Sequence, residues 1–277
     1  MSTGYIKTKS WTTKKLRIHK KQEANQTLQM LTCYDYQSAQ MLNETELDLI
    51  LVGDSLGNVI LGFENTLSVT IEHMKIFCSA VKRGAPNKFV IGDLPFGTYS
   101  TFEDGIKNAT DLFASSLIQA VKIEGAFAHH IELIKRLTQT GIPVMGHIGL
   151  TPQSVHELGG YYTHGKNKSS ENKLIKEAKD LEQAGCFAIV LECVMEDVSK
   201  KITDSISIPT IGIGSGRDTD GQVLVLNDLL KLSKEQPPKF CTPITDLYKY
   251  KQELINNYLN NNKIGEKKNT HEEFSLN

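Results

Sequence analysis

The chain has 277 residues, and its 31 Lys and Arg residues nearly balance 32 Asp and Glu residues, giving a formal net charge of −1. This balance argues against a nucleic-acid-binding protein, because such proteins usually carry a basic excess or a basic stripe. The sequence contains no run of about 18 apolar residues, so it predicts no membrane span. A hydrophobic share of 39% is enough for a sizeable core at this length.

The N-terminal region is basic. Its first 21 residues include Lys7, Lys9, Lys14, Lys15, Arg17, Lys20 and Lys21. This region lacks the apolar stretch of a secretory signal peptide. Two interpretations stay open: a patch for targeting or for an anionic surface, and a solvated lead-in helix whose N-cap is Thr12 or Thr13. Of the two, we favour the helix.

Strand-like and helix-like segments alternate along most of the chain. Short β-rich runs predict strands at residues 27–32, 49–54, 88–93, 120–125, 142–147, 186–192, 208–214 and 221–228. Helical spacing occupies the intervening segments, for example 68–84, 101–117 and 169–185. In the first of these, Ser68 or Thr70 is the expected cap and Gly84 the expected stop. Strands joined through helices are expected to run parallel.

Eight such units over about 250 residues predict an α/β fold, a (β/α)8 TIM barrel formed by one domain. The competing arrangement is a doubly wound open sheet, which usually places a glycine-rich phosphate-binding turn after its first strand. The sequence there, LTCYDYQ, contains no such turn. We expect residues 1–250 to form the barrel with an N-terminal helical lead-in, and residues 251–277 to form a helical, then loosely ordered, C-terminal tail.

Cysteine usage indicates a reducing compartment. The five cysteines are Cys33, Cys78, Cys186, Cys193 and Cys241. Their odd number and the absence of a CxxC pair suit reduced thiols. We therefore expect a cytoplasmic protein with most of these side chains in its core.

Polar residues gather where the predicted strands end. In chain order they are Asp54 and Ser55, Asp93, Lys122 and Glu124, His147, and Glu192. Side chains alternate along a strand, so Lys122 and Glu124 should point into the barrel while Val121 and Ile123 face the helices. In a barrel these strand ends meet at one mouth, where the active sites of this fold lie.

These residues form an unusual set. A single strand-end aspartate is more often a turn former, and a single histidine is more often a hydrogen-bonded core residue. Here, however, four acids from four strands would converge with a lysine and a histidine, and burying like charges is costly unless something compensates. Carboxylate oxygens select a hard ion such as Mg²⁺. The sequence thus predicts a metal-dependent enzyme, with a structural ion-pair network as the alternative.

Three other segments have less certain roles. The glycine-rich GIGSGRDTDG at residues 212–221 could bind phosphate or keep the barrel mouth open. Tyr34 or Asp35, after the first strand, could reach the mouth. His129 and His130 lie on a predicted helix and are expected at the surface.

Several long motifs resemble those of one known family. They are LTCYDY, LVGDSLG, TLSVT, VKRGAPNKFVIGDLPF, VKIEG, PVMGHIGLTPQSV, VLECV and IPTIGIGSG. From about residue 10 to about residue 245, the sequence resembles ketopantoate hydroxymethyltransferase, also named 3-methyl-2-oxobutanoate hydroxymethyltransferase. The motifs keep the order that they have in the family, so the resemblance is specific.

The resemblance implies transfer of a hydroxymethyl group from 5,10-methylenetetrahydrofolate to 2-oxoisovalerate. The product is 2-dehydropantoate, formed in the first committed step of pantothenate biosynthesis in the coenzyme A pathway. The resemblance also implies a Mg²⁺ ion in each subunit, a Mg-stabilised enolate, and a homo-oligomer, commonly a decamer. Small molecules are the expected partners, with no nucleic acid and no membrane.

The resemblance also assigns roles to residues. Metal ligands are implied at Asp54, Asp93 and Glu124. By motif, Asp54, Ser55, Asp93 and Lys122 would contact the oxoacid. Glu192 would accept the proton from the substrate.

Two other functions compete with this one. A relative of isocitrate lyase or phosphoenolpyruvate mutase would share the metal-and-enolate chemistry, but the KKCGH loop of the lyases is absent. A non-catalytic barrel that serves as a binding or scaffold subunit would show no turnover. The predicted cluster of charges argues against this second alternative.

Overall fold

The computed structural model describes residues 11–20 and 26–263 of the chain. By contacts, the chain divides after Leu226 into two compact units, each of which is described by itself. The domain boundary expected at residue 250 remains a prediction.

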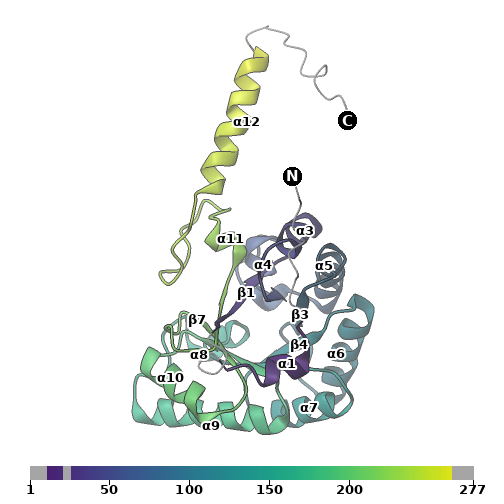
Figure 1. The fold of residues 1–277 in the computed structure, drawn as a ribbon, viewed down its shortest axis with the longest axis vertical. Coiled ribbons are helices and arrows are strands. Elements are labelled where there is room, and N and C mark those ends of the chain that lie inside the picture. The colour runs from purple at the N-terminus through teal and green to yellow at the C-terminus, as the bar shows by residue number, and fades with distance from the viewer. Residues whose placement is uncertain (1–10, 21–25, 264–277) are drawn as a thin grey trace. The chain divides into compact units, whose positions relative to one another are not determined.

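Eight parallel strands close into a barrel in which each strand pairs with its neighbours in chain order, and β1 pairs with β8. Figure 1 shows strands as arrows with helices around them. The strands are β1 (Leu28–Thr32), β2 (Leu49–Val52), β3 (Phe89–Asp93), β4 (Ala120–Glu124), β5 (Val144–Gly149), β6 (Ala188–Glu192), β7 (Thr210–Ile213) and β8 (Gly221–Leu224). The predicted (β/α)8 barrel is confirmed.

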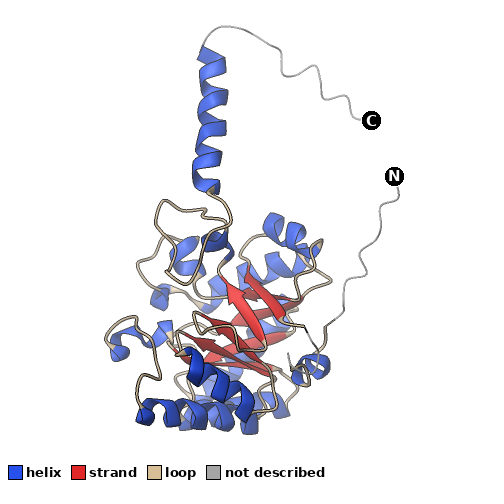
Figure 2. Ribbon diagram, turned by 60° about the vertical axis from the view of Figure 1, so that its left-hand side comes forward, coloured by secondary structure: helices blue, strands red, loops and turns tan. Residues whose placement is uncertain are grey.

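Helices surround the strands, as the blue and red ribbons of Figure 2 show. They are α3 (Tyr36–Asn43), α4 (Leu56–Val59), α5 (Ile71–Gly84), α6 (Phe102–Ser116), α7 (Ala128–Gln139), α8 (Val155–Leu158), α9 (Lys168–Ala184) and α10 (Glu196–Ser205), with the short 3-10 turns η1 (Thr66–Ser68) and η2 (Pro152–Ser154). Local chemistry sets their ends. The Thr70 side chain caps α5 by accepting from the His73 amide at 3.2 Å, and Gly185 ends α9 in a left-handed conformation.

The lead-in helix α1 (Thr13–Arg17) belongs to the barrel core. Thr12, one of the two predicted caps, is the N-cap and accepts a hydrogen bond from the backbone of Lys15 at 3.3 Å. Leu16 is fully buried in the cluster of barrel side chains, and Trp11 packs against the same cluster. The expectation of a solvated lead-in helix is therefore wrong for this apolar face, which covers the N-terminal end of the barrel.

Two of the N-terminal basic residues have structural partners. Arg17 donates a hydrogen bond to the carbonyl of Gly185 at 3.1 Å. Lys20 forms an ion pair with buried Asp220 at 2.6 Å. These contacts give the two cations a role in holding the lead-in against the barrel. Three further basic residues, Lys7, Lys9 and Lys21, lie outside the described residues.

On β3 and β4, inward-facing side chains change from apolar to charged toward the C-terminal end of the strand. On β3, Phe89 and Ile91 belong to the barrel core cluster, and Asp93 follows two residues later. On β4, Lys122 and Glu124 point the same way because side chains alternate. All three charged residues are buried, with at most 3% of their surface exposed. The apolar end of the barrel thus supplies the core, and the other end holds the charges.

All five cysteines are free thiols. Four are buried, and Cys193 is half-buried. Burial raises the pKa of Cys33 to about 11 and that of Cys186 to about 12, so both remain protonated at neutral pH. The prediction of reduced, mostly buried cysteines is confirmed.

The second unit begins within α11 (Leu226–Leu229) and contains α12 (Leu247–Lys263). Within it, Lys231 and Asp246 form an ion pair at 2.6 Å. α12 begins four residues before the expected tail, and the loosely ordered segment predicted after the helix lies outside the described residues from residue 264 onward. Across the described part of the chain, no helix combines the length and apolar character needed to cross a membrane.

We predict that Gly84→Ala lowers the free energy of unfolding by about 2 kcal/mol. A Cβ at Gly84 would lie 2.5 Å from the carbonyl oxygen of Tyr36 and 2.7 Å from the Cβ of Ala39, so α3 and α5 would have to separate. Urea denaturation measures the effect. Ile76→Ala, at an exposed position of the same helix, is the control and should change stability little. Equal stability of Gly84→Ala and the parent would contradict this account of the packing.

Candidate active site

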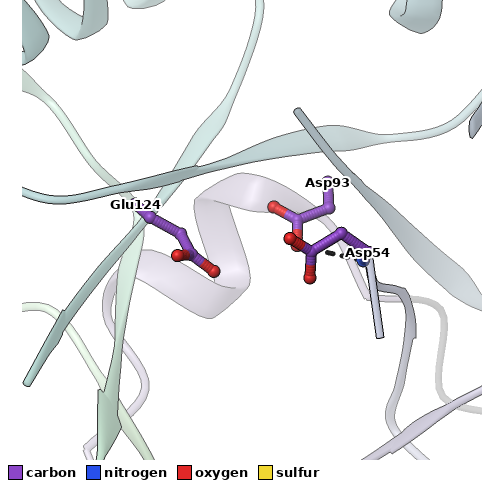
Figure 3. A group of neighbouring side chains, drawn as sticks. All are labelled: Asp54, Asp93 and Glu124. Atoms are coloured by element: carbon purple, nitrogen blue, oxygen red, sulfur yellow. Dashed lines mark hydrogen bonds between the residues drawn. The ribbon is translucent and has the colours of Figure 1, made fainter. Parts of the chain in front are cut away.

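Three buried carboxylates meet at the C-terminal mouth of the barrel. Asp54 follows β2, Asp93 ends β3 and Glu124 ends β4, and each is at most 4% exposed. One oxygen from each side chain lies within 4.8 Å of the other two. Figure 3 shows the three side chains pointing toward one another. Neighbouring parallel strands thus bring together three of the acids that the sequence predicted to converge.

Lys122 lies between two of these acids. Its Nζ is 2.9 Å from Asp93 Oδ2 and 3.0 Å from Glu124 Oε1. Burial works against the charged ammonium group, but Asp93, Glu124 and Asp54 outweigh it and hold the pKa of Lys122 well above its usual value. Lys122 therefore carries a positive charge, and this charge offsets part of the cost of burying the acids.

His147, on β5, connects the acid cluster to Glu192, the last residue of β6. His147 Nδ1 lies 3.3 Å from Glu124 Oε1, and Nε2 lies 3.4 Å from Glu192 Oε2. Burial and Lys122 oppose its protonation, but Glu124 and Glu192 raise the pKa of His147 to about 9. Glu192 is the most open member of the set, with 18% of its side chain exposed.

The cluster is short of positive charge. Burial, Asp93 and Glu124 raise the pKa of Asp54 well above its usual value. Burial also raises the pKa of Asp93, to about 6, although Lys122 opposes the shift. Burial would raise the pKa of Glu124 as well, but Lys122 and His147 outweigh it and lower that pKa to about 2. Three ionised carboxylates would thus exceed the two cations by one charge, and a proton or a further cation must balance it.

The donor set fits a divalent cation. Asp93 Oδ1 is buried and has no hydrogen-bond partner, although an orphaned carboxylate oxygen is costly. Asp54 and Glu124 each place an oxygen close to one from Asp93. Three carboxylates without sulfur ligands favour a hard ion such as Mg²⁺. The cluster can therefore hold a metal ion.

Ser55 lies beside the acid cluster and bonds to Tyr34. The Tyr34 and Ser55 hydroxyl oxygens are 2.7 Å apart, and Tyr34 is buried. Tyr34 is thus the residue after β1 that reaches the mouth. The Asp35 side chain instead caps α3 by accepting from the Ser38 amide at 2.8 Å.

Gln153 and Tyr99 belong to the site, but strand-end reasoning missed them. Gln153 lies in the turn η2, and its side chain donates a hydrogen bond to Asp54 Oδ2 at 3.0 Å. Tyr99 lies in the loop after β3 and donates to Gln153 Oε1 at 2.5 Å. The only sequence signal was the position of Gln153 inside the motif PVMGHIGLTPQSV, since neither residue ends a strand.

The glycine-rich loop at residues 212–221 is fixed to its neighbours. Ser215 Oγ donates to the Leu191 carbonyl at 2.8 Å and accepts from the Val194 amide at 3.0 Å. Gly216 has a φ of 77°, and a Cβ there would collide with Glu196. These contacts give the loop a packing role beside β6, while phosphate binding remains untested.

His130 is buried, so the expectation of a surface position is wrong for this residue. Its ring packs edge-on against Tyr99 at 5.3 Å and against Phe127 at 5.5 Å, measured between ring centroids. Burial, followed by the neighbouring His129, lowers its pKa to about 4. His130 is therefore a neutral part of the aromatic packing behind Tyr99.

A pocket of about 550 Å³ begins beyond the ends of β4 and β5. Its lining includes Phe127, Tyr162, His164, Lys166, Lys173 and Glu177. Tyr162 and His164 stack with their ring centroids 4.5 Å apart. His164 Nε2 is buried and has no hydrogen-bond partner. Lys173 forms an ion pair with Glu177 at 3.7 Å, and Glu157 also lines the pocket, so two glutamates accompany the two lysines. The aromatic faces and the free ring nitrogen suit a flat, polar small molecule.

The fold is that of barrel enzymes, whose active sites lie at the C-terminal mouth, and the acid cluster lies at this mouth. Solved structures of this fold include 2,3-dimethylmalate lyase, a PEP mutase/isocitrate lyase superfamily member, at a TM-score of 0.58 and 12% identity, covering 91% of this chain and 97% of that one. Phosphonopyruvate hydrolase in complex with oxalate and Mg²⁺ matches at a TM-score of 0.58 and 10% identity, covering 78% of this chain and 81% of the other. At such identities these matches establish the fold alone.

Sequence relatives identify the family. A model of the ketopantoate hydroxymethyltransferase family matches residues 11–266. The 3-methyl-2-oxobutanoate hydroxymethyltransferase of Leptospira interrogans is 48% identical over 254 residues, covering 90% of this chain and 96% of the relative. The enzyme of the same name from Thermotoga maritima is 50% identical over 230 residues, covering 83% of this chain and 84% of the relative. The chain therefore belongs to the ketopantoate hydroxymethyltransferase family, and the predicted resemblance is confirmed.

His130 should make stability depend on pH. With a pKa of about 4 when folded and 6.5 as its ordinary value, the imidazole takes up a proton in the unfolded chain first as pH falls. The free energy of unfolding should therefore fall between pH 6.5 and pH 4, by about 2–3 kcal/mol from this group. Urea denaturation at several pH values measures the loss.

Two variants isolate this contribution. His130→Phe should lose that part of the pH dependence, because a phenyl ring fits the same aromatic packing without titrating. His156→Phe, at an exposed histidine in α8, is the control and should keep the parental pH profile. An unchanged profile in a folded His130→Phe protein would contradict the assignment.

Proposed function

We propose that the protein is a 3-methyl-2-oxobutanoate hydroxymethyltransferase. It would transfer a hydroxymethyl group from 5,10-methylenetetrahydrofolate to 2-oxoisovalerate and release 2-dehydropantoate for pantothenate biosynthesis. The observation that carries the proposal is the meeting of Asp54, Asp93 and Glu124 around Lys122 at the barrel mouth. The chain is 48% identical to a relative of that name, and this similarity supports the choice of substrate.

In this proposal Asp54, Asp93 and Glu124 hold one Mg²⁺ ion per subunit. When bound, the ion supplies positive charge to the oxoacid and so makes its C3 hydrogen more acidic. Asp54, Ser55, Asp93 and Lys122 border the space for the oxoacid. Lys122 keeps Asp93 and Glu124 ionised and adds positive potential near the substrate carboxylate.

Glu192 is the proposed base. Its partial exposure leaves it accessible from the mouth, and His147 links it to Glu124. Glu192 takes the C3 proton, and the electron pair of that C–H bond forms the enolate. The enolate carbon then forms a bond to the methylene carbon of the folate. Both bonds from that carbon to the folate nitrogens break, and water supplies the hydroxyl group of the product. The two nitrogens take up the proton removed from C3 and the remaining proton of the water. Protonated His147 would hold the Glu192 carboxylate in place.

The pocket beyond β4 and β5 supports the folate assignment. It starts at Gly125 and Gly149, immediately after Glu124 and two residues after His147. Its volume of about 550 Å³ lies within the range of small-molecule sites. We assign the folate ring system to the aromatic wall and its glutamate carboxylates to Lys166 and Lys173.

The oligomer and the location are proposed from family membership. Homo-oligomers, commonly decamers, are expected in this family. The free, mostly buried cysteines support a cytoplasmic location.

A turnover assay separates this function from its rivals. Purified protein is incubated with Mg²⁺, 2-oxoisovalerate and methylenetetrahydrofolate, and 2-dehydropantoate is followed by NMR. The proposal expects product that appears only with the folate and is lost with EDTA. Cleavage of oxoacids without the folate would indicate a lyase or mutase instead. No turnover by folded protein would favour a non-catalytic barrel.

Glu192→Gln should slow deuterium exchange at C3 of 2-oxoisovalerate by about 100-fold or more, because general-base catalysis typically contributes that much. The amide fills the same space but cannot take the proton. Mg²⁺ affinity, measured by calorimetry, should change much less. Glu196→Gln, at an exposed glutamate in α10, is the control. Exchange at the parental rate in Glu192→Gln would remove Glu192 as the base.

Lys173→Ala should raise the KM for methylenetetrahydrofolate several-fold, because it removes a cation from the proposed folate pocket. Its effect on C3 deuterium exchange without folate should be small. Lys176→Ala, at an exposed position on the same helix, serves as the control. An unchanged folate KM in both Lys173→Ala and Lys166→Ala would place the folate elsewhere.

A further inference from the structure

We propose that Gln153 is a positioning residue for the acid cluster and that Tyr99 sets the orientation of its amide. The inference rests on the metal centre proposed above, and it adds two residues to which no role has been given. Both are buried, with 5% of Gln153 and 7% of Tyr99 exposed.

Gln153 bonds to two of the three carboxylates at once. Its backbone N–H donates to Glu124 Oε2 at 3.2 Å. Its side-chain Nε2 donates to Asp54 Oδ2 at 3.0 Å. These two bonds act on carboxylates from different strands, so Gln153 sets how Asp54 and Glu124 are turned toward each other.

The amide has one favourable orientation. Nε2 donates to the Leu94 carbonyl at 3.0 Å as well as to Asp54, and Oε1 accepts from the Tyr99 hydroxyl at 2.5 Å. Turning the amide over would bring Oε1 against two acceptor oxygens, Leu94 O and Asp54 Oδ2. Tyr99 thus completes the set of partners that directs the NH₂ group to Asp54.

Rigid surroundings hold both residues in place. The Tyr99 ring packs against His130 at a centroid distance of 5.3 Å. The backbone before Gln153 is also fixed. Gly149 adopts a φ of 96°, and a Cβ at this residue would collide with the Glu192 carbonyl. The next residue, Leu150, donates to the same carbonyl at 2.8 Å, which directs the chain into the turn that carries Gln153.

The uncharged hydrogen-bond donors of Gln153 suit their position beside the acid cluster. Lys122 already supplies a positive charge to Asp93 and Glu124. A further cation at position 153, beside Lys122 and His147, would cancel the charge that attracts a metal ion. The amide instead fixes the carboxylate of Asp54 while leaving the cluster negative. Loss of this donor should therefore weaken metal binding through geometry.

The test uses Mn²⁺ as the probe, with electron paramagnetic resonance to count bound ions. Gln153→Met keeps the side-chain length and the backbone bond to Glu124 but removes the donor to Asp54. We expect its Kd for Mn²⁺ to rise at least tenfold, or about 1.4 kcal/mol. The spectrum of bound Mn²⁺ should also change, because the ligand geometry changes. In turnover, the KM for 2-oxoisovalerate should rise more than kcat falls.

Tyr99→Phe gives an independent readout and protects the test if Gln153→Met folds poorly. It removes one hydroxyl and keeps the ring against His130, so its Kd should rise by a smaller factor. The double variant should bind Mn²⁺ as Gln153→Met does, because Tyr99 acts through Gln153. Gln119→Met removes a glutamine that accepts a structural hydrogen bond from the Val90 amide at the other end of the barrel. It should leave the Mn²⁺ affinity unchanged.

Three results would overturn the inference. A Mn²⁺ Kd within twofold of the parent in both single variants, with an unchanged spectrum, would show that Gln153 and Tyr99 do not position the acids. That result would leave the proposed metal centre in place. Additive effects in the double variant would mean that Tyr99 does not act through Gln153. No Mn²⁺ binding by the parent protein would refute the proposed metal centre, and with it this inference.

Discussion

The buried ammonium group of Lys122 is the interaction on which the mouth of the barrel depends. It lies within 3.0 Å of carboxylate oxygens from both Asp93 and Glu124. An unpaired charge at such depth would be strongly destabilising, and so would the acids without it. Yet Lys122 and a protonated His147 together cannot balance three ionised carboxylates. The residual negative charge is what makes the cluster suited to binding a metal ion rather than to simple structural pairing.

Barrel geometry explains why these groups meet. Each strand turns alternate side chains inward, so its last inward residue lies at the mouth. Asp93, Glu124 and Glu192 are the last residues of β3, β4 and β6, and Asp54 lies two residues beyond the end of β2. Earlier inward residues such as Ile91 form the apolar core. On β3, β4 and β6 the same period-two pattern therefore builds a stable interior and a charged mouth from single short strands. Asp54 does not follow this pattern, because it lies in the turn after β2, whose inward residues are Leu49 and Leu51.

The strands, and the acids at their ends, could be predicted from the sequence because both follow local periodic rules. Lys122 was predictable for the same reason, since it shares a face with Glu124. Gln153 and Tyr99 were not, because they lie in loops whose course depends on tertiary contacts such as those of Gly149 and His130. The burial of Leu16 was missed for a related reason. A helix of five residues gives too little periodicity to show which face packs against a barrel.

The central claim is that this acid cluster binds a metal ion that promotes removal of a proton from an oxoacid. Its most direct test is deuterium exchange at C3 of 2-oxoisovalerate in D₂O, followed by proton NMR with purified protein and no folate. The account predicts exchange that requires Mg²⁺ and stops when EDTA is added. Exchange that is unaffected by EDTA, or no exchange by folded, Mg²⁺-loaded protein with or without the folate, would contradict it.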